Sequence, residues 1–132
     1  MSQKFAKLVL FLLLAALLAA CGKKEMSVGR AENGGTVELK TGETLMVSLD
    51  SNITTGYSWE IQETDETLLK LKGDPEYIEP KSDPQLAGAG GRQVFRFEAL
   101  KAGQTTLTLV YRRPWEKDVA PIDTYSLTVT VK

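Results

Sequence analysis

The sequence predicts an all-β fold, an antiparallel β-sandwich of about seven strands, for residues 36–132. Three observations predict it. From Thr36 onward, apolar residues recur mainly at every second position, which is the spacing of half-buried strands. Glycines and prolines divide this region into short segments. No long amphipathic helical pattern follows the N-terminal segment.

Six segments show the alternation most clearly. Their apolar positions are Val37 and Leu39; Leu45, Val47 and Leu49; Tyr57, Trp59 and Ile61; Phe95 and Phe97; Leu107, Leu109 and Tyr111; and Tyr125, Leu127, Val129 and Val131. The residues between them are mostly polar, as expected for sheets that bury one face and expose the other. A seventh strand is expected around Leu68 to Leu71, and the alternative there is a helical turn from Asp65 to Leu71.

Residues 1–20 have the layout of a bacterial secretory signal peptide. Lys4 and Lys7 precede an apolar run from Leu8 to Ala20, and small residues come directly before Cys21. The run is shorter than the ~20 residues that a helix needs to cross a bilayer, which disfavours a permanent transmembrane helix. The segment is therefore expected to be removed.

Cys21 is the only cysteine, so the chain forms no internal disulfide. The residues before it resemble a lipobox, which implies acylation of Cys21, a palmitate-type membrane anchor and a place in the bacterial cell envelope. The other reading is an ordinary signal peptide with an incidental cysteine. Gly22 is not acidic, which favours the outer over the inner membrane. Residues 21–35 are polar and glycine-containing, and we expect a flexible, periplasmic tether there.

Several functions are disfavoured by composition. The chain has no histidine, so it lacks the commonest general base and the commonest transition-metal ligand. Its acidic residues are scattered, which argues against carboxylate chemistry. A formal net charge of -1 gives no support to nucleic-acid binding. We therefore expect a protein that is not an enzyme and that has no cofactor, metal or small-molecule substrate. We also expect a monomer.

Three connections between the predicted strands stand out. The first reads Asn52-Ile53-Thr54-Thr55-Gly56-Tyr57, the second contains Gly88-Ala89-Gly90-Gly91, and the third reads Arg113-Pro114-Trp115-Glu116. Gly56 permits a close backbone approach, and Pro114 prevents the strand from continuing. Trp115 fits either a core side chain that folds back or an interface anchor, because tryptophan is enriched at binding hot spots.

In this order, the three loops resemble those of the chagasin-like inhibitors of cysteine peptidases, which have the forms Asn-Pro-Thr-Thr-Gly-Tyr/Phe, Gly-x-Gly-Gly and Arg-Pro-Trp-Glu. The resemblance implies an immunoglobulin-like sandwich that reversibly occludes the cleft of a papain-like cysteine peptidase. It implies no catalytic or metal-binding residue. The implied peptidase-binding residues are Asn52, Ile53, Thr54, Thr55, Gly56, Tyr57, Gly88, Gly90, Gly91, Arg113, Pro114, Trp115 and Glu116.

The resemblance also implies a role for each loop. Thr54, Thr55 and Gly56 would lie over the peptidase's Cys–His pair, the glycines of the second loop would follow the cleft wall, and Trp115 would pack beside the active site. Arg113 and Glu116 would pair with polar groups at the rim. Tyr57 and Trp59 are expected to point into the core.

One residue departs from the family's motif. Ile53 stands where the family usually has proline. The isoleucine either loosens the loop, which would weaken binding by about 0.4–1 kcal/mol, or adds an apolar contact. A second function stays open beside inhibition, in which an immunoglobulin-like envelope lipoprotein acts as a structural or adhesive module and its loops are incidental.

Overall fold

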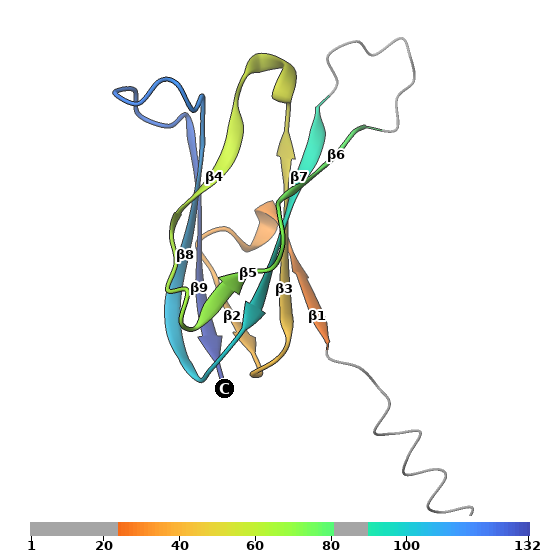
Figure 1. The fold of residues 1–132 in the computed structure, drawn as a ribbon, viewed down its shortest axis with the longest axis vertical. Coiled ribbons are helices and arrows are strands. Elements are labelled where there is room, and N and C mark those ends of the chain that lie inside the picture. Colours follow the sequence, from red (N-terminus) through yellow and green to blue (C-terminus); the bar gives the residue numbers. More distant parts are fainter. Residues whose placement is uncertain (1–23, 81–89) are drawn as a thin grey trace, which may run out of the picture.

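The computed structural model describes residues 24–80 and 90–132, which form two β-sheets packed face to face (Figure 1). The predicted signal peptide, Cys21 and Gly88 lie outside these residues. The first sheet has the order β1 (Glu25–Val28), β3 (Thr44–Ser51), β7 (Gly91–Ala99), β5 (Leu69–Leu71), and β6 (Glu76–Ile78) also pairs with β7. The second has the order β2 (Thr36–Leu39), β9 (Asp123–Val131), β8 (Gly103–Arg112), β4 (Ser58–Glu63).

The core confirms the predicted all-β sandwich and its alternation. Apolar side chains from both sheets interdigitate in one cluster, in which Leu45, Phe97 and Leu127 are fully buried. Residues 65–71 combine the two predicted alternatives. The Leu69 amide donates to the Asp65 carbonyl (2.8 Å), which closes a turn, and β5 follows at once.

The predicted tether over residues 21–35 is wrong from residue 25 onward, because residues 25–28 form β1 and residues 29–35 are bonded to the sandwich, as when the Gly34 amide donates to the Ser126 carbonyl (2.7 Å). This strand runs parallel to β3, with Met26 opposite Leu45 and Val28 opposite Val47. Met26 and Val28 alternate correctly for a strand, and Val28 is buried in the core. The alternating segment is too short to stand out in the sequence, and its neighbour β3 supplies both its hydrogen bonds and its apolar cover.

A 3-10 turn, η1 (Arg30–Glu32), follows β1, and the chain then enters the other sheet as β2. Because β1 and β2 are joined by a crossing between sheets instead of a hairpin, each can pair parallel with its neighbour. The pairs β1–β3 and β2–β9 are parallel and the others antiparallel. Within the described ranges, no helix has the length and apolar character needed to cross a membrane.

Candidate peptidase-binding site

One end of the sandwich carries all three connections singled out in the sequence (Figure 1). The first joins β3 to β4 through residues 52–57. The second joins β6 to β7, and residues 79, 80 and 90 of it are described. The third joins β8 to β9 through residues 113–122. We call these residues the loop end. Strand pairing within the two sheets therefore brings together segments that are far apart in the chain.

Hydrogen bonds within the first loop fix its shape. Residues 53–55 form a 3-10 turn, η2 (Ile53–Thr55), capped by Asn52. Asn52 Oδ1 accepts hydrogen bonds from the Thr54 amide (3.3 Å) and the Thr54 hydroxyl (2.6 Å), and the Thr55 hydroxyl donates to the Asn52 carbonyl (2.6 Å). The Asn52 amide donates to the hydroxyl of Tyr111 on β8 (3.0 Å). The turn is thus held in place without a proline at position 53.

Gly56 brings the first and third loops into contact. Its φ of 81° lies in the left-handed region, which favours glycine. A Cβ atom at this position would lie 2.4 Å from Cη2 of Trp115, so the indole rests against the Gly56 backbone. Trp115 nevertheless keeps 68% of its surface exposed. The alternative in which Trp115 folds back into the core is therefore wrong.

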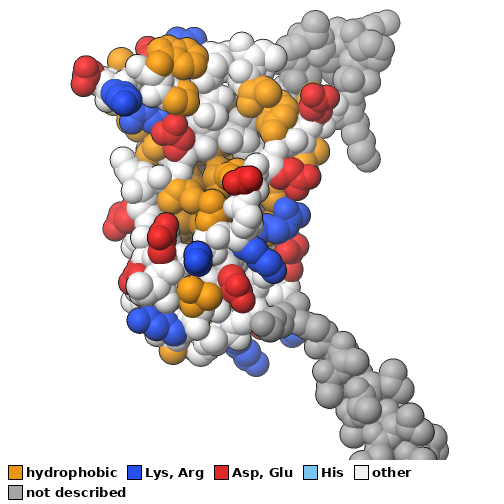
Figure 2. Space-filling model, viewed as in Figure 1, with side chains coloured by type: hydrophobic (Ala, Val, Ile, Leu, Met, Phe, Trp, Pro, Cys, Tyr) orange, Lys and Arg blue, Asp and Glu red, His pale blue; other side chains and the backbone are white. Residues whose placement is uncertain are grey.

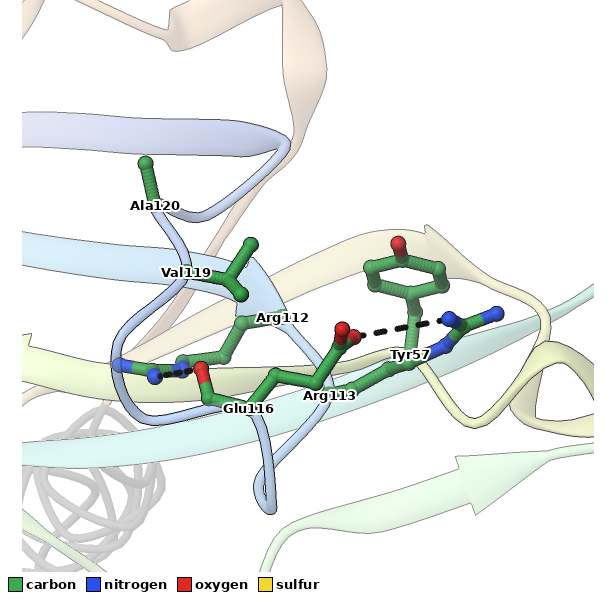
Figure 3. A pocket seen from close by; sticks show the side chains of 6 residues that line it. All are labelled: Tyr57, Arg112, Arg113, Glu116, Val119 and Ala120. Carbon is green, nitrogen blue, oxygen red and sulfur yellow. Dashed lines mark hydrogen bonds and ion pairs between the residues drawn. The ribbon is translucent and has the colours of Figure 1, made fainter.

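Arg113 links the same two loops. Its Nε donates to the Thr55 carbonyl (3.0 Å), and its guanidinium carbon lies 4.5 Å from the ring centroid of Tyr57. Nη1 is 3.5 Å from the Glu116 carboxylate, and Figure 3 shows this pair beside the Tyr57 ring. Arg113 and Glu116 thus already have partners within the loop end, and their pairing with a peptidase stays a prediction.

Arg112, the last residue of β8, completes the third loop and was not predicted. Its Nη2 donates to the Glu116 carbonyl (2.6 Å). A small pocket lies beside this bond (Figure 3). It is lined by Tyr57, Arg112, Arg113, Glu116, Val119 and Ala120. The sequence offered one sign that Arg112 belongs to the site: it directly precedes the Arg-Pro-Trp-Glu sequence at the end of a strand.

The second loop departs from its predicted role at Gly91. We expected a glycine at the flexible rim, but Gly91 is buried as the first residue of β7. A Cβ there would lie 2.2 Å from the Ile78 carbonyl oxygen, and the Gly91 amide donates to the Tyr77 hydroxyl (3.1 Å). Gly91 is therefore needed for the close packing of β6 on β7. Gly90 is exposed and remains available for backbone contact with a partner.

A polar cross-link ties the two sheets together beneath the loops. Gln93 Oε1 on β7 accepts hydrogen bonds from the Ser51 hydroxyl (2.8 Å) and from the Trp59 amide on β4 (2.7 Å). Trp59 is 4% exposed, and its indole nitrogen donates to the Asp50 carbonyl (2.9 Å). The predicted core position of Trp59 is confirmed. The predicted core position of Tyr57 is wrong, because Tyr57 is only partly buried, lies outside the core cluster and sits at the loop end between Tyr111 and Arg113.

Exposed apolar side chains gather at the loop end. Of the described residues, six large hydrophobic ones are exposed, and only Leu100 lies at the opposite end of the sandwich. The others are Ile53, Ile78, Trp115, Val119 and Ile122. Figure 2 shows apolar side chains at the top of the molecule among charged ones. Apolar residues clustered within a polar rim are typical of protein interaction sites.

The fold and this end of it define a class of protein, a β-sandwich whose first and third loops contact each other at one end. Residues 38–129 match the model of the chagasin family of peptidase inhibitors (I42), and the chain belongs to that family. This confirms the predicted class of function, a proteinaceous inhibitor of cysteine peptidases and not an enzyme.

Two relatives agree with this assignment, and a solved structure has the same fold. The chain is 32% identical over 107 residues to Amoebiasin-1 of Entamoeba histolytica, covering 81% of this chain and 100% of that protein. It is 33% identical over 93 residues to Chagasin of Trypanosoma cruzi, covering 67% and 81%. The crystal structure of the cysteine protease inhibitor EhICP2 from Entamoeba histolytica shares the fold, with a TM-score of 0.75 at 24% identity over 83% of this chain and 97% of that one.

Proposed function

We propose that the loop end carries out the inhibition, by entering and reversibly occluding the active-site cleft of a papain-like cysteine peptidase. The observation that supports this most directly is the joined tip of the first and third loops. There Trp115 lies against Gly56 with most of its indole exposed, and Arg113 holds the two loops together through the Thr55 carbonyl. A partner can bury this exposed area without reordering the loops, which lowers the entropy cost of binding.

The mechanism is occlusion without covalent chemistry. The first loop carries no electrophile for a cysteine thiolate, and its two threonine hydroxyls already donate within the loop. Thr54, Thr55 and Gly56 would cover the catalytic Cys–His pair, with Trp115 packed on the apolar surface beside it. Gly88 and Gly90 would contact the cleft wall through their backbones. Gly91 is withdrawn from this set because it is buried under β6.

The test is a titration of residues 22–132, which include every described strand, against papain. We expect dose-dependent competitive inhibition. Papain activity should return after dilution or dialysis of the complex, as reversible occlusion requires. Circular dichroism would verify that the protein is folded. A folded protein that leaves papain and a second papain-like peptidase fully active would contradict the proposal. It would favour the alternative of an envelope interaction module.

We propose further that the protein is a lipoprotein of the bacterial envelope, anchored through Cys21 and favouring the outer membrane. The signal-peptide layout and the residues before Cys21 support this. Because β1 begins at Glu25, only Gly22, Lys23 and Lys24 separate the anchor from the sandwich, a reach of roughly 14 Å. Labelled palmitate should enter the full-length protein in a bacterial host, and Cys21→Ser should abolish the label. Labelling that persists in the variant would contradict the anchor.

The short link also orients the inhibitor. β1 starts at the end of the sandwich that holds the C terminus, opposite the loop end (Figure 1). A nine-residue strand such as β9 spans roughly 30 Å. An anchor at Cys21 would therefore hold one end of the sandwich near the membrane and point the loop end away from it, where a peptidase can approach.

A further inference from the structure

We infer that Ile53 is the side chain by which the first loop selects among peptidases. It would enter an apolar subsite beside the catalytic pair, while the Thr54 and Thr55 hydroxyls act only inside the loop. The inference rests on the proposed function and adds to it the chemistry of the subsite that is recognised. It separates two tasks within one turn, positioning by the threonines and recognition by the isoleucine.

The threonine hydroxyls are already used as donors. Thr54 Oγ1 donates to Asn52 Oδ1 (2.6 Å), and Thr55 Oγ1 donates to the Asn52 carbonyl (2.6 Å) while accepting from the Tyr57 amide (3.4 Å). A hydroxyl has one hydrogen to donate. Donation to a peptidase would therefore break a bond that shapes the loop, so these groups serve better as internal links than as recognition groups.

The Ile53 side chain, unlike the threonine hydroxyls, has no role inside the loop. It is outside the buried core cluster, and the residue keeps 49% of its surface exposed. Its carbonyl accepts from the Gly56 amide (3.0 Å), and the capping bonds of Asn52 fix the rest of the turn. The backbone that carries the Ile53 side chain is thus fixed by bonds that do not involve that side chain. An apolar group in this state gains free energy when a partner removes it from water.

The surroundings favour an apolar partner surface. Trp115 lies against Gly56 within the same loop contact, so an interface that covers the indole continues onto the turn that carries Ile53. No charged residue occurs between Asn52 and Tyr57. The nearby cation, Arg113, donates to the Thr55 carbonyl and is already paired with the Glu116 carboxylate (3.5 Å). The chemistry that fits this tip is an apolar subsite of the cleft, and a subsite that ends in an acidic group would fit poorly.

The experiment compares inhibition constants against two papain-like peptidases, one with an apolar subsite beside the scissile bond and one whose subsite ends in a carboxylate. For Ile53→Ala we expect the constant to rise about tenfold for the apolar-subsite enzyme, which is the value of burying roughly half an isoleucine side chain. For the acidic-subsite enzyme it should stay within about twofold. Ile53→Lys should reverse the preference, because a cation would meet the carboxylate.

Thr54→Val is the matched control, since it keeps the shape of the side chain and removes the hydroxyl. It should raise both constants by a similar factor, because a loosened loop affects every partner. The inference is overturned if Ile53→Ala raises both constants equally, or if Thr54→Val changes the ratio between enzymes. A folded wild-type domain that inhibits neither enzyme would instead reject the proposed function.

Discussion

The two ends of the sandwich are closed in different ways. At the end opposite the loops, backbone bonds join separate turns: the Gly42 amide donates to the Ala99 carbonyl (2.7 Å) and the Thr41 amide to the Lys132 carbonyl (3.0 Å), and the Thr41 hydroxyl adds a side-chain bond to that carbonyl (3.2 Å). At the loop end, side chains make the links, such as Arg113 to the Thr55 carbonyl and the Asn52 amide to Tyr111. Side-chain links allow longer loops whose apolar residues stay exposed. One end therefore stabilises the fold, and the other is free to bind.

The two tryptophans offer the largest test of this difference. Trp115→Ala should weaken inhibition about thirtyfold or more, as for a binding hot spot, and change the free energy of unfolding by less than about 0.5 kcal/mol. Trp59→Ala removes a buried indole, its bond to Asp50 and part of the core. It should cost about 3–5 kcal/mol of stability. Urea unfolding and papain inhibition, measured on both variants, check this.

The comparison fails if Trp115→Ala unfolds the domain, which would make the exposed indole a structural residue after all. It also fails if Trp115→Ala inhibits as well as the wild type. The inhibition constant of Trp59→Ala is to be measured only where the variant is folded, so that lost folding is not read as lost binding.

Gly56 tests the contact between the loops at a smaller scale. Gly56→Ala meets both a left-handed φ and the Trp115 ring, and it should weaken inhibition about tenfold by displacing the indole. Gly34→Ala is a matched control, because Gly34 has a φ of 80° but nothing within 4 Å of its added Cβ. Both should lose about 1 kcal/mol of stability from backbone strain. Equal inhibition constants for the two variants would contradict the role assigned to the contact.

Tyr125 should give the smallest effect, confined to the core. Its hydroxyl is buried and has no hydrogen-bond partner among the described residues. Burial first, and then the Glu32 charge, raise the pKa of Tyr125 to about 12, while Arg30 lowers it. At neutral pH, Tyr125→Phe should be neutral or stabilising by up to about 1 kcal/mol, because an unpaired buried hydroxyl is removed.

The raised pKa also predicts a pH dependence with a definite sign. The folded state holds the phenol proton more tightly than the unfolded state, whose tyrosine titrates near 10. The contribution of the protonated Tyr125 phenol to the free energy of unfolding is thus fully present below about pH 10 and is lost as the pH rises toward 12. Wild type should lose more stability than Tyr125→Phe over this range in urea unfolding. Inhibition at neutral pH should be the same in both, and parallel pH curves would contradict the assignment.

Much of the fold could be predicted because apolar and polar residues alternate along a strand that buries one face and exposes the other. The apolar positions of β3, β7, β8 and β9 were correct, since each repeats over several residues and is buried by the opposite sheet. β1 and β6 were missed. Each has only three or four residues and gains its pairing from β3 or β7, so its own sequence carries little signal.

The loop motifs could be found in the sequence, but the roles of single residues within them could not. Gly90 and Gly91 are neighbours of the same type, yet one is exposed and the other is buried against Ile78. Tyr111 was expected as a core residue, and its hydroxyl also holds the Asn52 amide. Such assignments depend on contacts between segments some 14 to 59 residues apart, as for Tyr77 with Gly91 and Asn52 with Tyr111.

The sequence by itself determined the sandwich class, the three loops and the family they resemble, because periodicity and motifs are local properties of the chain. Only the tertiary structure decided that the indole of Trp115 rests on Gly56, that Arg113 joins two loops, and that Ile53 is exposed while the threonine hydroxyls are not free. The physical reason is that a side chain's exposure and partners depend on what distant strands place beside it.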